Sequence, residues 1–215
     1  MAGKFITFEG GEGAGKSTQI ARLAKRLEGE GVSVVVTREP GGTPTAEAIR
    51  GALLSGLAQE LGAEGEAVLF AAARADHVDR VIRPALRAGQ WVLCDRFTDS
   101  TRVYQGVAGG VDVATLGALE RISVGRTQPD LTIILDVPVE TGLARAAKRR
   151  SERNAATDRF EREDPGIHEA RRKAYLAIAR AEPDRCIVID AGRSEAKVAR
   201  AVWQAVSLRL LKRAA

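Results

Sequence analysis

"FEGGEGAGKSTQ", residues 8–19, has the spacing of a phosphate-binding loop: a glycine, four further residues, and then Gly-Lys-Ser. An apolar run, Phe5–Phe8, precedes this stretch, and an amphipathic helical pattern begins after it at Ile20. These are the strand and the helix that such a loop requires on its two sides. Its glycines let backbone N–H groups point at one anion, and the N-terminus of the following helix adds partial positive charge. The sequence therefore predicts a nucleoside triphosphate site.

The last residues of this loop predict the rest of the triphosphate site. Lys16 is placed to reach the outer phosphates, and the Ser17 hydroxyl can bind Mg²⁺. A carboxylate at the end of a neighbouring strand is also needed, and Asp95 follows the apolar run Trp91–Cys94. We therefore expect Ser17 and Asp95 to hold the metal. The loop residues expected to bind ATP are Gly10, Gly11, Glu12, Gly13, Ala14, Gly15, Lys16, Ser17 and Thr18.

Apolar runs alternate with helical patterns along the whole chain. The five expected strands are Phe5–Phe8, Val32–Val36, Trp91–Cys94, Leu131–Val137 and Cys186–Ile189. The expected helices are 20–27, 64–88 with an interruption at Pro84, 113–119, one that starts at Pro138, and 198–208. Continuous apolar strands between helices indicate a parallel sheet covered on both faces. The predicted fold class is therefore α/β, a three-layer α/β/α P-loop NTPase with a five-stranded parallel sheet.

Composition restricts the function classes further. The chain has 215 residues, which suits one domain, and no apolar run approaches the length of a membrane span. No signal-peptide pattern precedes the first strand, so we expect a cytoplasmic protein. The net charge of +5 could indicate nucleic acid, but the 4% aromatic content argues against a base-stacking surface. The two cysteines are expected to be buried and reduced, and the two histidines to be structural.

The residue after Asp95 distinguishes between the classes of protein that contain a phosphate-binding loop. Guanine-nucleotide switches carry an Asn/Thr-Lys-x-Asp motif, which the sequence lacks. Motor ATPases place a glutamate after the magnesium aspartate, whereas Arg96 stands here. A cation at this position favours the binding of a second anion over the activation of a water molecule. The acceptor is therefore expected to be a phosphate, which is mostly dianionic at neutral pH and needs no general base.

The segment 145–164 differs from the rest of the chain, because it is dense in charge and lacks an apolar stripe. We expect it to contain a mobile arginine-rich lid at about residues 145–162, with a loop at Asn154–Thr157; a solvated charged helix would have a similar sequence. Its basic residues are Arg145, Lys148, Arg149, Arg150, Arg153, Arg159 and Arg162.

Phe70 and Arg74 stand four residues apart and so share one face of a predicted helix. Phe70 could stack on a flat base while Arg74 donates to its carbonyl edge. The alternative is that Phe70 lies in the core and Arg74 in solvent, and the spacing alone favours this alternative.

Several segments in order resemble the bacterial thymidylate kinase family over essentially the whole chain. They are FEGGEGAGKST, TREPGGTP, LFAAARADH, WVLCDRFTDSTRVYQG, QPDLTIILDV, GLARA and DRFERED. The resemblance implies a single kinase domain that transfers the γ-phosphoryl group of ATP to dTMP, for dTTP biosynthesis, with Mg²⁺ and as a homodimer. The alternatives are a kinase for another pyrimidine monophosphate, such as dUMP or UMP, and a P-loop ATPase that is not a kinase.

The same resemblance implies roles for individual residues. Arg96 and Arg50 would bind the acceptor phosphate, while Phe70 and Arg74 would stack on thymine and bond its O4. Tyr104 would pack beside the deoxyribose, and Glu12 would lie near the 3′-hydroxyl. The residues expected to read the other edge of the base are Ser100, Thr101 and Gln105.

The loop of this chain carries Glu12 and lacks the arginine that some family members place there. The resemblance therefore implies that the lid supplies the missing charge, and that Arg145 lies against the adenine. The expected catalytic residues are Lys16, Arg96, Arg149, Arg150 and Arg153.

Overall fold

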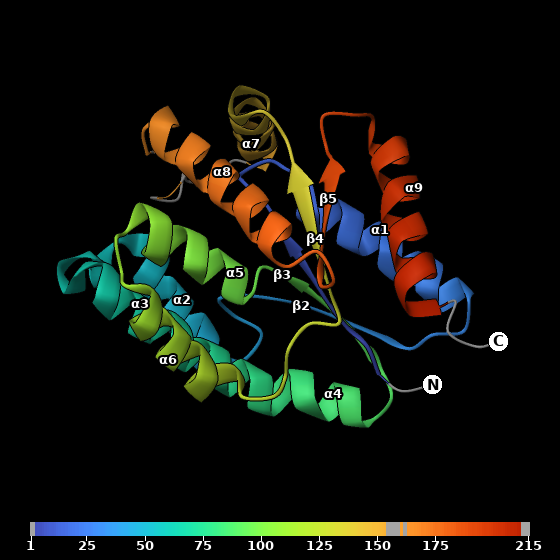
Figure 1. The fold of residues 1–215 in the computed structure, drawn as a ribbon, viewed down its shortest axis with the longest axis horizontal. Helices are drawn as coiled ribbons and strands as arrows, with labels where there is room; N and C mark the ends of the chain where they lie inside the picture. Colours follow the sequence, from blue (N-terminus) through green and yellow to red (C-terminus); the bar gives the residue numbers. More distant parts are fainter. Residues whose placement is uncertain (1–2, 154–159, 161–162, 212–215) are drawn as a thin grey trace.

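Five parallel strands form one sheet in the order β2-β3-β1-β4-β5 (Figure 1). The strands are β1 (Phe5–Glu9), β2 (Val34–Arg38), β3 (Trp91–Asp95), β4 (Leu131–Asp136) and β5 (Cys186–Asp190). The computed structural model describes residues 3–153, 160 and 163–211, without the side chain of Arg153. The predicted α/β fold class and the five-stranded sheet are confirmed.

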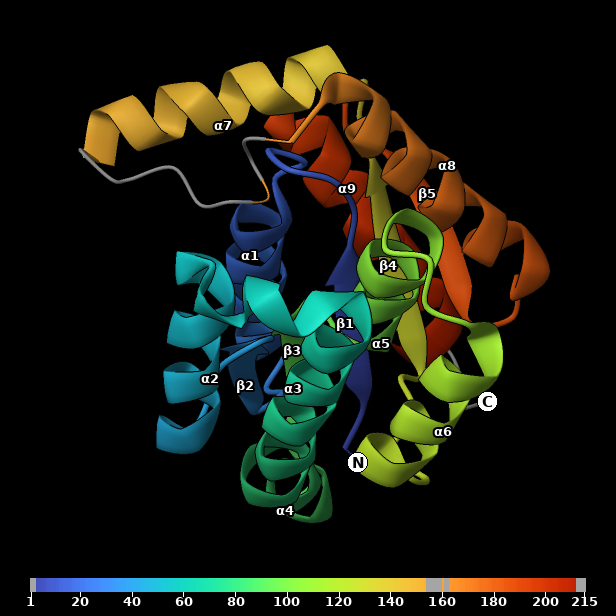
Figure 2. The same cartoon turned by 90° about the vertical axis from the view of Figure 1, so that its left-hand side faces the viewer.

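Helices cover both faces of the sheet, as a parallel sheet requires. On one face, α1 (Lys16–Gly29) packs beside α9 (Glu195–Val206), and most of the remaining helices gather on the other face, except α7 (Val139–Arg153), which crosses the end of the sheet (Figure 1 and Figure 2). The remaining helices are α2 (Pro44–Ser55), α3 (Gly62–His77), α4 (Arg83–Arg87), α5 (Thr98–Thr101), α6 (Val113–Val124) and α8 (Pro165–Ala181). The short turns are η1 (Leu57–Leu61), η2 (Val78–Ile82), η3 (Arg102–Ala108) and η5 (Ser207–Leu211).

The core has two main parts, one on each side of the sheet. Side chains alternate along a strand, so Ile6 and Phe8 of β1 pack toward α1 while Phe5 packs on Phe97 at a ring distance of 4.9 Å. Both faces of β1 are fully buried. Burial on both faces explains why the central strands β1, β3 and β4 read as nearly continuous apolar runs in the sequence.

The second strand begins two residues later than predicted. The backbone N–H of Val32 donates to the carbonyl of Leu27 at 3.0 Å, so Val32 closes the end of α1 and the strand starts at Val34. Pro84 does not interrupt the helical path after α3, because it occupies the first turn of α4, where its missing N–H leaves no gap. Three α-helices were not predicted: α2, α8 and the short α5.

Two smaller predictions are confirmed. Cys94 and Cys186 are buried free thiols, and no helix in the described part of the chain is long and apolar enough to span a membrane. His77 is fully buried and hydrogen-bonds to Thr37 and Glu39, as expected of a histidine with a structural role.

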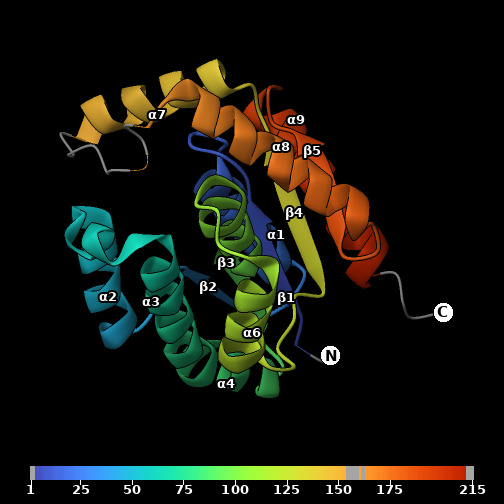
Figure 3. The same ribbon diagram turned by 60° about the vertical axis from the view of Figure 1, so that its left-hand side comes forward.

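The carboxyl ends of the strands and α7 enclose one region of the molecule. Figure 2 shows α7 crossing above the loop that joins β1 to α1, with α2 and α3 below it. Figure 3 shows the same elements from an intermediate angle, with α7 above the α2–α3 pair. The predicted lid begins within α7, since its first residues, 145–153, are helical. The expected loop Asn154–Thr157, as well as Arg159 and Arg162, lies outside the described residues.

Candidate active site

The loop between β1 and α1 has the curled backbone that its glycines predict. Gly13 and Gly15 have positive φ angles of 65° and 90°, and a Cβ at Gly13 would collide with the carbonyl of Gly142. Lys16 is buried, and its Nζ donates to the carbonyls of Gly10 and Gly11 at 3.1 Å each. The Lys16 side chain therefore folds back into the loop and bonds to its backbone carbonyls.

The two expected metal ligands lie in contact. Ser17 Oγ donates to Asp95 Oδ2 over 2.8 Å, although 78 residues separate them in sequence. A hydroxyl and a carboxylate at the mouth of a phosphate-binding loop are oxygen donors of the kind that Mg²⁺ prefers. The residues present therefore suit the metal. Within the described ranges, no group of three or more acidic, histidine or cysteine side chains forms another candidate metal site.

Arg96 lies at the centre of the site and has an unusual backbone. Its φ angle of 68° is the only positive value for a non-glycine residue in the described part of the chain. Its guanidinium donates to Glu12 Oε1 at 2.6 Å and to the hydroxyls of Ser100 and Tyr175 at 3.2 Å each. The same group lies 4.9 Å from the centre of the Tyr104 ring. The half-buried cation is thereby held in one position.

Two carboxyls near the loop have opposite pKa shifts. Burial raises the pKa of Glu9 to about 7, assisted by the negative charge of Asp99. Burial would also raise the pKa of Glu12, but the charges of Arg96 and Lys16 lower it to about 2. Burial together with Arg96 lowers the pKa of Lys16. The site thus has Glu12 firmly ionised next to Arg96, and a second carboxyl that titrates near neutrality.

A cavity of about 380 Å³ runs from the loop to α3. It brings together all nine residues expected to bind the acceptor: Glu12, Arg50, Phe70, Arg74, Arg96, Ser100, Thr101, Tyr104 and Gln105. They come from the loop, from helices α2, α3 and α5, and from the turns that follow β3. The structure therefore gathers into one pocket residues that lie far apart in the sequence.

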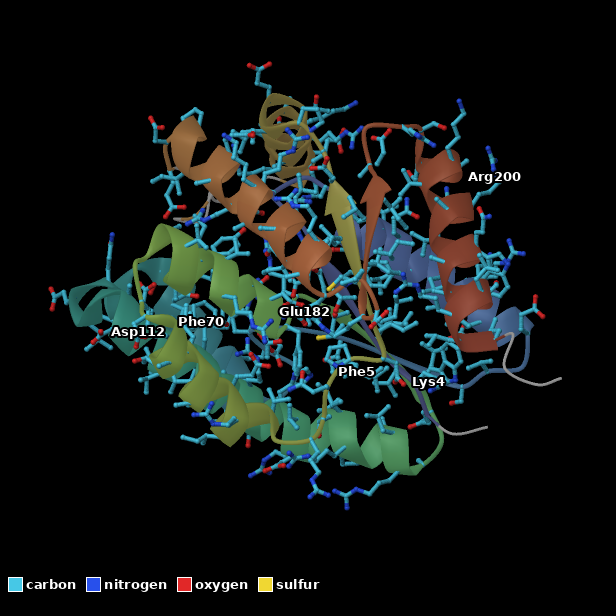
Figure 4. All side chains as sticks on the ribbon, in the orientation of Figure 1. Lys4, Phe5, Phe70, Asp112, Glu182 and Arg200 are labelled. Atoms are coloured by element: carbon cyan, nitrogen blue, oxygen red, sulfur yellow. The ribbon has the colours of Figure 1, made fainter. Side chains whose placement is uncertain are left out.

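Arg74 is more constrained than its sequence position suggests. It is only 4% exposed, and its guanidinium donates to Glu39 at 2.7 Å and to the Thr101 hydroxyl at 3.0 Å. Phe70, labelled in Figure 4, is half-buried and lines the same cavity. The alternative of a solvated arginine with a core phenylalanine is thus wrong for Arg74. The expected role of Arg74 in binding the base remains a prediction.

The lid arginines differ in where they lie. Arg145 donates to the Ala191 carbonyl at 2.8 Å, beside the loop that follows β5. Arg149 lines the cavity, whereas Arg150 is not among the lining residues. The Arg153 side chain lies outside the described part. Of the two expected catalytic lid residues whose side chains are described, Arg149 lies at the pocket and Arg150 does not line it.

Sequence reasoning missed several lining residues. They are Arg38, Glu39, Pro40, Leu54, Phe97 and Phe160. Arg38 to Pro40 belong to the TREPGGTP segment, which offered a signal, whereas Leu54 stands in a helix with no distinguishing pattern. Glu9 was also missed, because a lone glutamate at a strand end looks like any surface residue.

A phosphate-binding loop, a Ser–Asp pair for a metal, and a second cation-lined pocket define this chain as a P-loop nucleotide-binding protein with room for a second ligand. The family model described as thymidylate kinase matches residues 8–202. The chain belongs to the thymidylate kinase family.

Individual relatives agree with the family match. The chain is 57% identical to a thymidylate kinase of Afipia carboxidovorans, over 97% of this chain and 90% of the relative. It is 59% identical to one from Bradyrhizobium sp., over 97% and 91% of the two chains. Among solved structures, the thymidylate kinase of Ehrlichia chaffeensis matches with a TM-score of 0.76 and 34% identity, covering 96% of this chain and 99% of that chain.

Proposed function

We propose that the protein transfers the γ-phosphoryl group of ATP to dTMP, which gives ADP and dTDP. Membership of the thymidylate kinase family supports this activity. The observation that carries it in this chain is the position of Arg96, between the phosphate-binding loop and the cavity that leads to Phe70. A cation at this point can bind an acceptor phosphate within reach of a triphosphate held by the loop.

The reaction requires position and charge more than acid-base chemistry. The phosphate of dTMP is already mostly dianionic at neutral pH, so it can attack without a general base. Lys16 and the backbone N–H groups of the loop would hold the triphosphate, and Arg96 would hold the acceptor in line with it. Mg²⁺ held by Ser17 and Asp95 would neutralise charge on the phosphates.

The lid would complete the positive surroundings of the transferred group. Because the loop carries Glu12 where an arginine could stand, an additional cation must come from elsewhere. Arg149 lines the cavity and is our candidate, with Arg150 and Arg153 as further lid cations. Arg145 is proposed to lie against the adenine, since it sits beside the loop after β5.

The pocket offers the features that a thymine nucleotide requires. Phe70 supplies an apolar ring, and Arg50 and Arg74 supply guanidiniums. The Tyr104 ring, held by Arg96, is proposed to pack on the sugar, where a 2′-hydroxyl would clash. Ser100, Thr101 and Gln105 would read the remaining edge of the base.

We also propose a cytoplasmic homodimer, with no nucleic acid or membrane partner. ATP and dTMP are cytoplasmic metabolites. Neighbouring helices α3 and α6 expose apolar side chains, including Val68 at 52% and Ile122 at 79%, which a second copy would cover. Light scattering at increasing protein concentration tests the dimer, and a monomer at all concentrations would contradict it.

The activity is tested by ADP release from ATP and Mg²⁺ with dTMP, dUMP, UMP, dCMP and AMP side by side. We expect strong turnover with dTMP and, since a methyl group is worth about 1–3 kcal/mol in an apolar pocket, at least about tenfold less with dUMP. Equal turnover with several pyrimidine monophosphates would replace dTMP by a broader substrate class. Hydrolysis of ATP that none of them accelerates would overturn the kinase.

A further inference from the structure

Arg96 adopts a backbone conformation that side chains with a Cβ rarely choose. A φ angle of 68° is disfavoured for arginine, and it persists only when the surroundings impose it. The peptide groups next to Arg96 show what imposes it. Its own N–H donates to the Phe8 carbonyl at 2.9 Å, and its carbonyl accepts from Cys94 Sγ at 3.1 Å. The next N–H, that of Phe97, donates to the carboxylate of Glu9 at 2.7 Å.

Glu9 also holds the surroundings of the Arg96 guanidinium. Its Oε2 accepts hydrogen bonds from the hydroxyls of Ser100 at 2.6 Å and Tyr175 at 3.2 Å. These two hydroxyls are the same ones that accept from the Arg96 guanidinium. One fully buried carboxylate thus fixes both the backbone turn that carries Arg96 and two of the three hydrogen-bond partners of its side chain.

We propose that Glu9 is a positioning residue that holds Arg96 where it binds the acceptor phosphate. Glu9 itself lies outside the cavity and touches none of the expected ligand atoms, since it does not line the pocket. It acts through Arg96, Ser100 and Tyr175. The inference rests on the proposed function for its kinetic consequence, but its structural part concerns only the geometry of this chain.

The carboxylate has a chemical property that an amide cannot replace. When ionised, as at pH 8, Glu9 only accepts, so Phe97 N–H and both hydroxyls donate to it, which leaves oxygen lone pairs of the hydroxyls free for Arg96. In Glu9→Gln the amide NH₂ would donate toward the hydroxyls, which lie 2.9 Å apart, so one hydroxyl could donate to the other while the second would lose its acceptor. The hydroxyls would reorient and Arg96 would lose its fixed partners.

A matched control lies three residues after Arg96. Asp99 is equally buried and carries the same chemical group, but it pairs with Arg185 at 2.7 Å and contacts neither Arg96 nor Glu9 through a hydrogen bond among the described residues. Asp99→Asn therefore removes a buried carboxylate of the same region and leaves the hydrogen bonds that hold Arg96 in place. It should leave the kinetic constants of the folded enzyme within about twofold of wild type.

The test measures kcat and both KM values at pH 8 for wild type, E9Q, Y175F and D99N. We expect E9Q to raise the KM for dTMP by about tenfold or more, because a hydrogen-bonded charged group has lost its supports, with the KM for ATP within about twofold. Y175F removes one hydroxyl of the network and should raise the KM for dTMP about threefold. This milder variant decides the question if E9Q does not fold.

A crystal structure of E9Q tests the positioning without any substrate. We expect residue 96 to leave its positive φ angle, or its guanidinium to move away from Glu12. An unchanged Arg96 together with wild-type kinetics, or an equal kinetic loss in D99N, would overturn the proposal. If wild type itself does not phosphorylate dTMP, the proposed function fails, and the position of Arg96 in E9Q still decides the structural claim.

Discussion

Arg96 and Glu12 form an ion pair at 2.6 Å, and the Tyr104 hydroxyl donates to the same Glu12 oxygen at 3.0 Å. The arginine proposed to bind the acceptor is thus already paired with a carboxylate of the phosphate-binding loop. Glu12 remains ionised at all ordinary pH values, since its pKa is about 2. A dianionic acceptor therefore has to compete with, or share, this arginine.

The first prediction concerns the shape of the Arg96 side chain. Arg96→Lys keeps the charge but loses the planar fork that can contact Glu12 and a phosphate together. We expect kcat/KM for dTMP to fall by about 10²–10³-fold, comparable to losing one fixed donor at a reacting phosphate. The matched control is Arg200→Lys, on the outer face of α9 (Figure 4), which should change kcat/KM less than twofold. A similar loss in both variants would contradict the assignment.

The second prediction concerns the metal. Asp95→Asn replaces an anionic ligand by a neutral one next to Ser17, so the Mg²⁺ concentration for half-maximal activity should rise about tenfold or more. Removal of divalent cations with EDTA should abolish turnover in wild type, and added Mg²⁺ should restore it.

Asp112→Asn is the control for the metal prediction. Asp112 caps the N-terminus of α6, and asparagine caps a helix about as well as aspartate. Asp112 does not line the cavity that contains Asp95, so the Mg²⁺ requirement of the D112N enzyme should equal that of wild type. A D95N enzyme with an unchanged Mg²⁺ requirement would place the metal elsewhere.

The third prediction separates the lid arginines. Arg149 lines the cavity and Arg150 does not, so Arg149→Ala should lower kcat about 10²-fold with little change in the KM for dTMP. Arg150→Ala should have the smaller effect on kcat. Lys148→Ala, which removes an exposed cation one position earlier, is the control. If R150A loses more activity than R149A, the lid arrangement in this structure is not the catalytic one.

Much of the fold could be predicted from local sequence. The central strands β1, β3 and β4 are buried on both faces and therefore appear as apolar runs with distinct ends, whereas the edge strands β2 and β5 are only partly buried. α8 was missed because its buried positions include His168 and Arg171, which do not register as an apolar stripe. α2 was missed because only Ala46 and Leu53 are buried in it. Polar or sparse burial removes the periodic signal on which such predictions depend.

The site was less predictable than the fold, apart from its loop. The Gly-Lys-Ser spacing and the Asp95–Arg96 pair carry their chemistry in the sequence, and the structure brings them together as expected. Glu9 carries no such signal. Its importance arises from contacts with residues 88 and 166 positions away, Phe97 and Tyr175, which only the folded chain brings together.

The last prediction concerns the pH dependence of stability. The pKa of Glu9 rises from 4.5 to about 7 on folding, so between these values the folded protein binds more protons at this site than the unfolded chain. The free energy of unfolding contributed by Glu9 should therefore fall as pH rises from about 5 to 7, and level off above 7. The glutamine of E9Q does not titrate and cannot show this change.

The groups around Glu9 define how this change is measured. Asp99 on α5 raises the pKa of Glu9 and Arg96 lowers it, while Lys16 on α1, Cys94 on β3 and Tyr175 on α8 also feel its charge. Urea unfolding of wild type and E9Q at several pH values subtracts contributions that the two proteins share. We expect the stability of wild type relative to E9Q to decline from about pH 5 to 7, with a slope of at most one proton.

Glu12→Gln provides the opposite case. The pKa of Glu12 is lowered from 4.5 to about 2, so its stabilising contribution is complete above pH 4.5 and is lost only as pH falls toward 2. The stability difference between wild type and E12Q should therefore stay constant from about pH 6 to 8, where the difference for E9Q still changes. A constant difference for both variants would show that Glu9 is ionised throughout, and that the basic groups around it outweigh its burial.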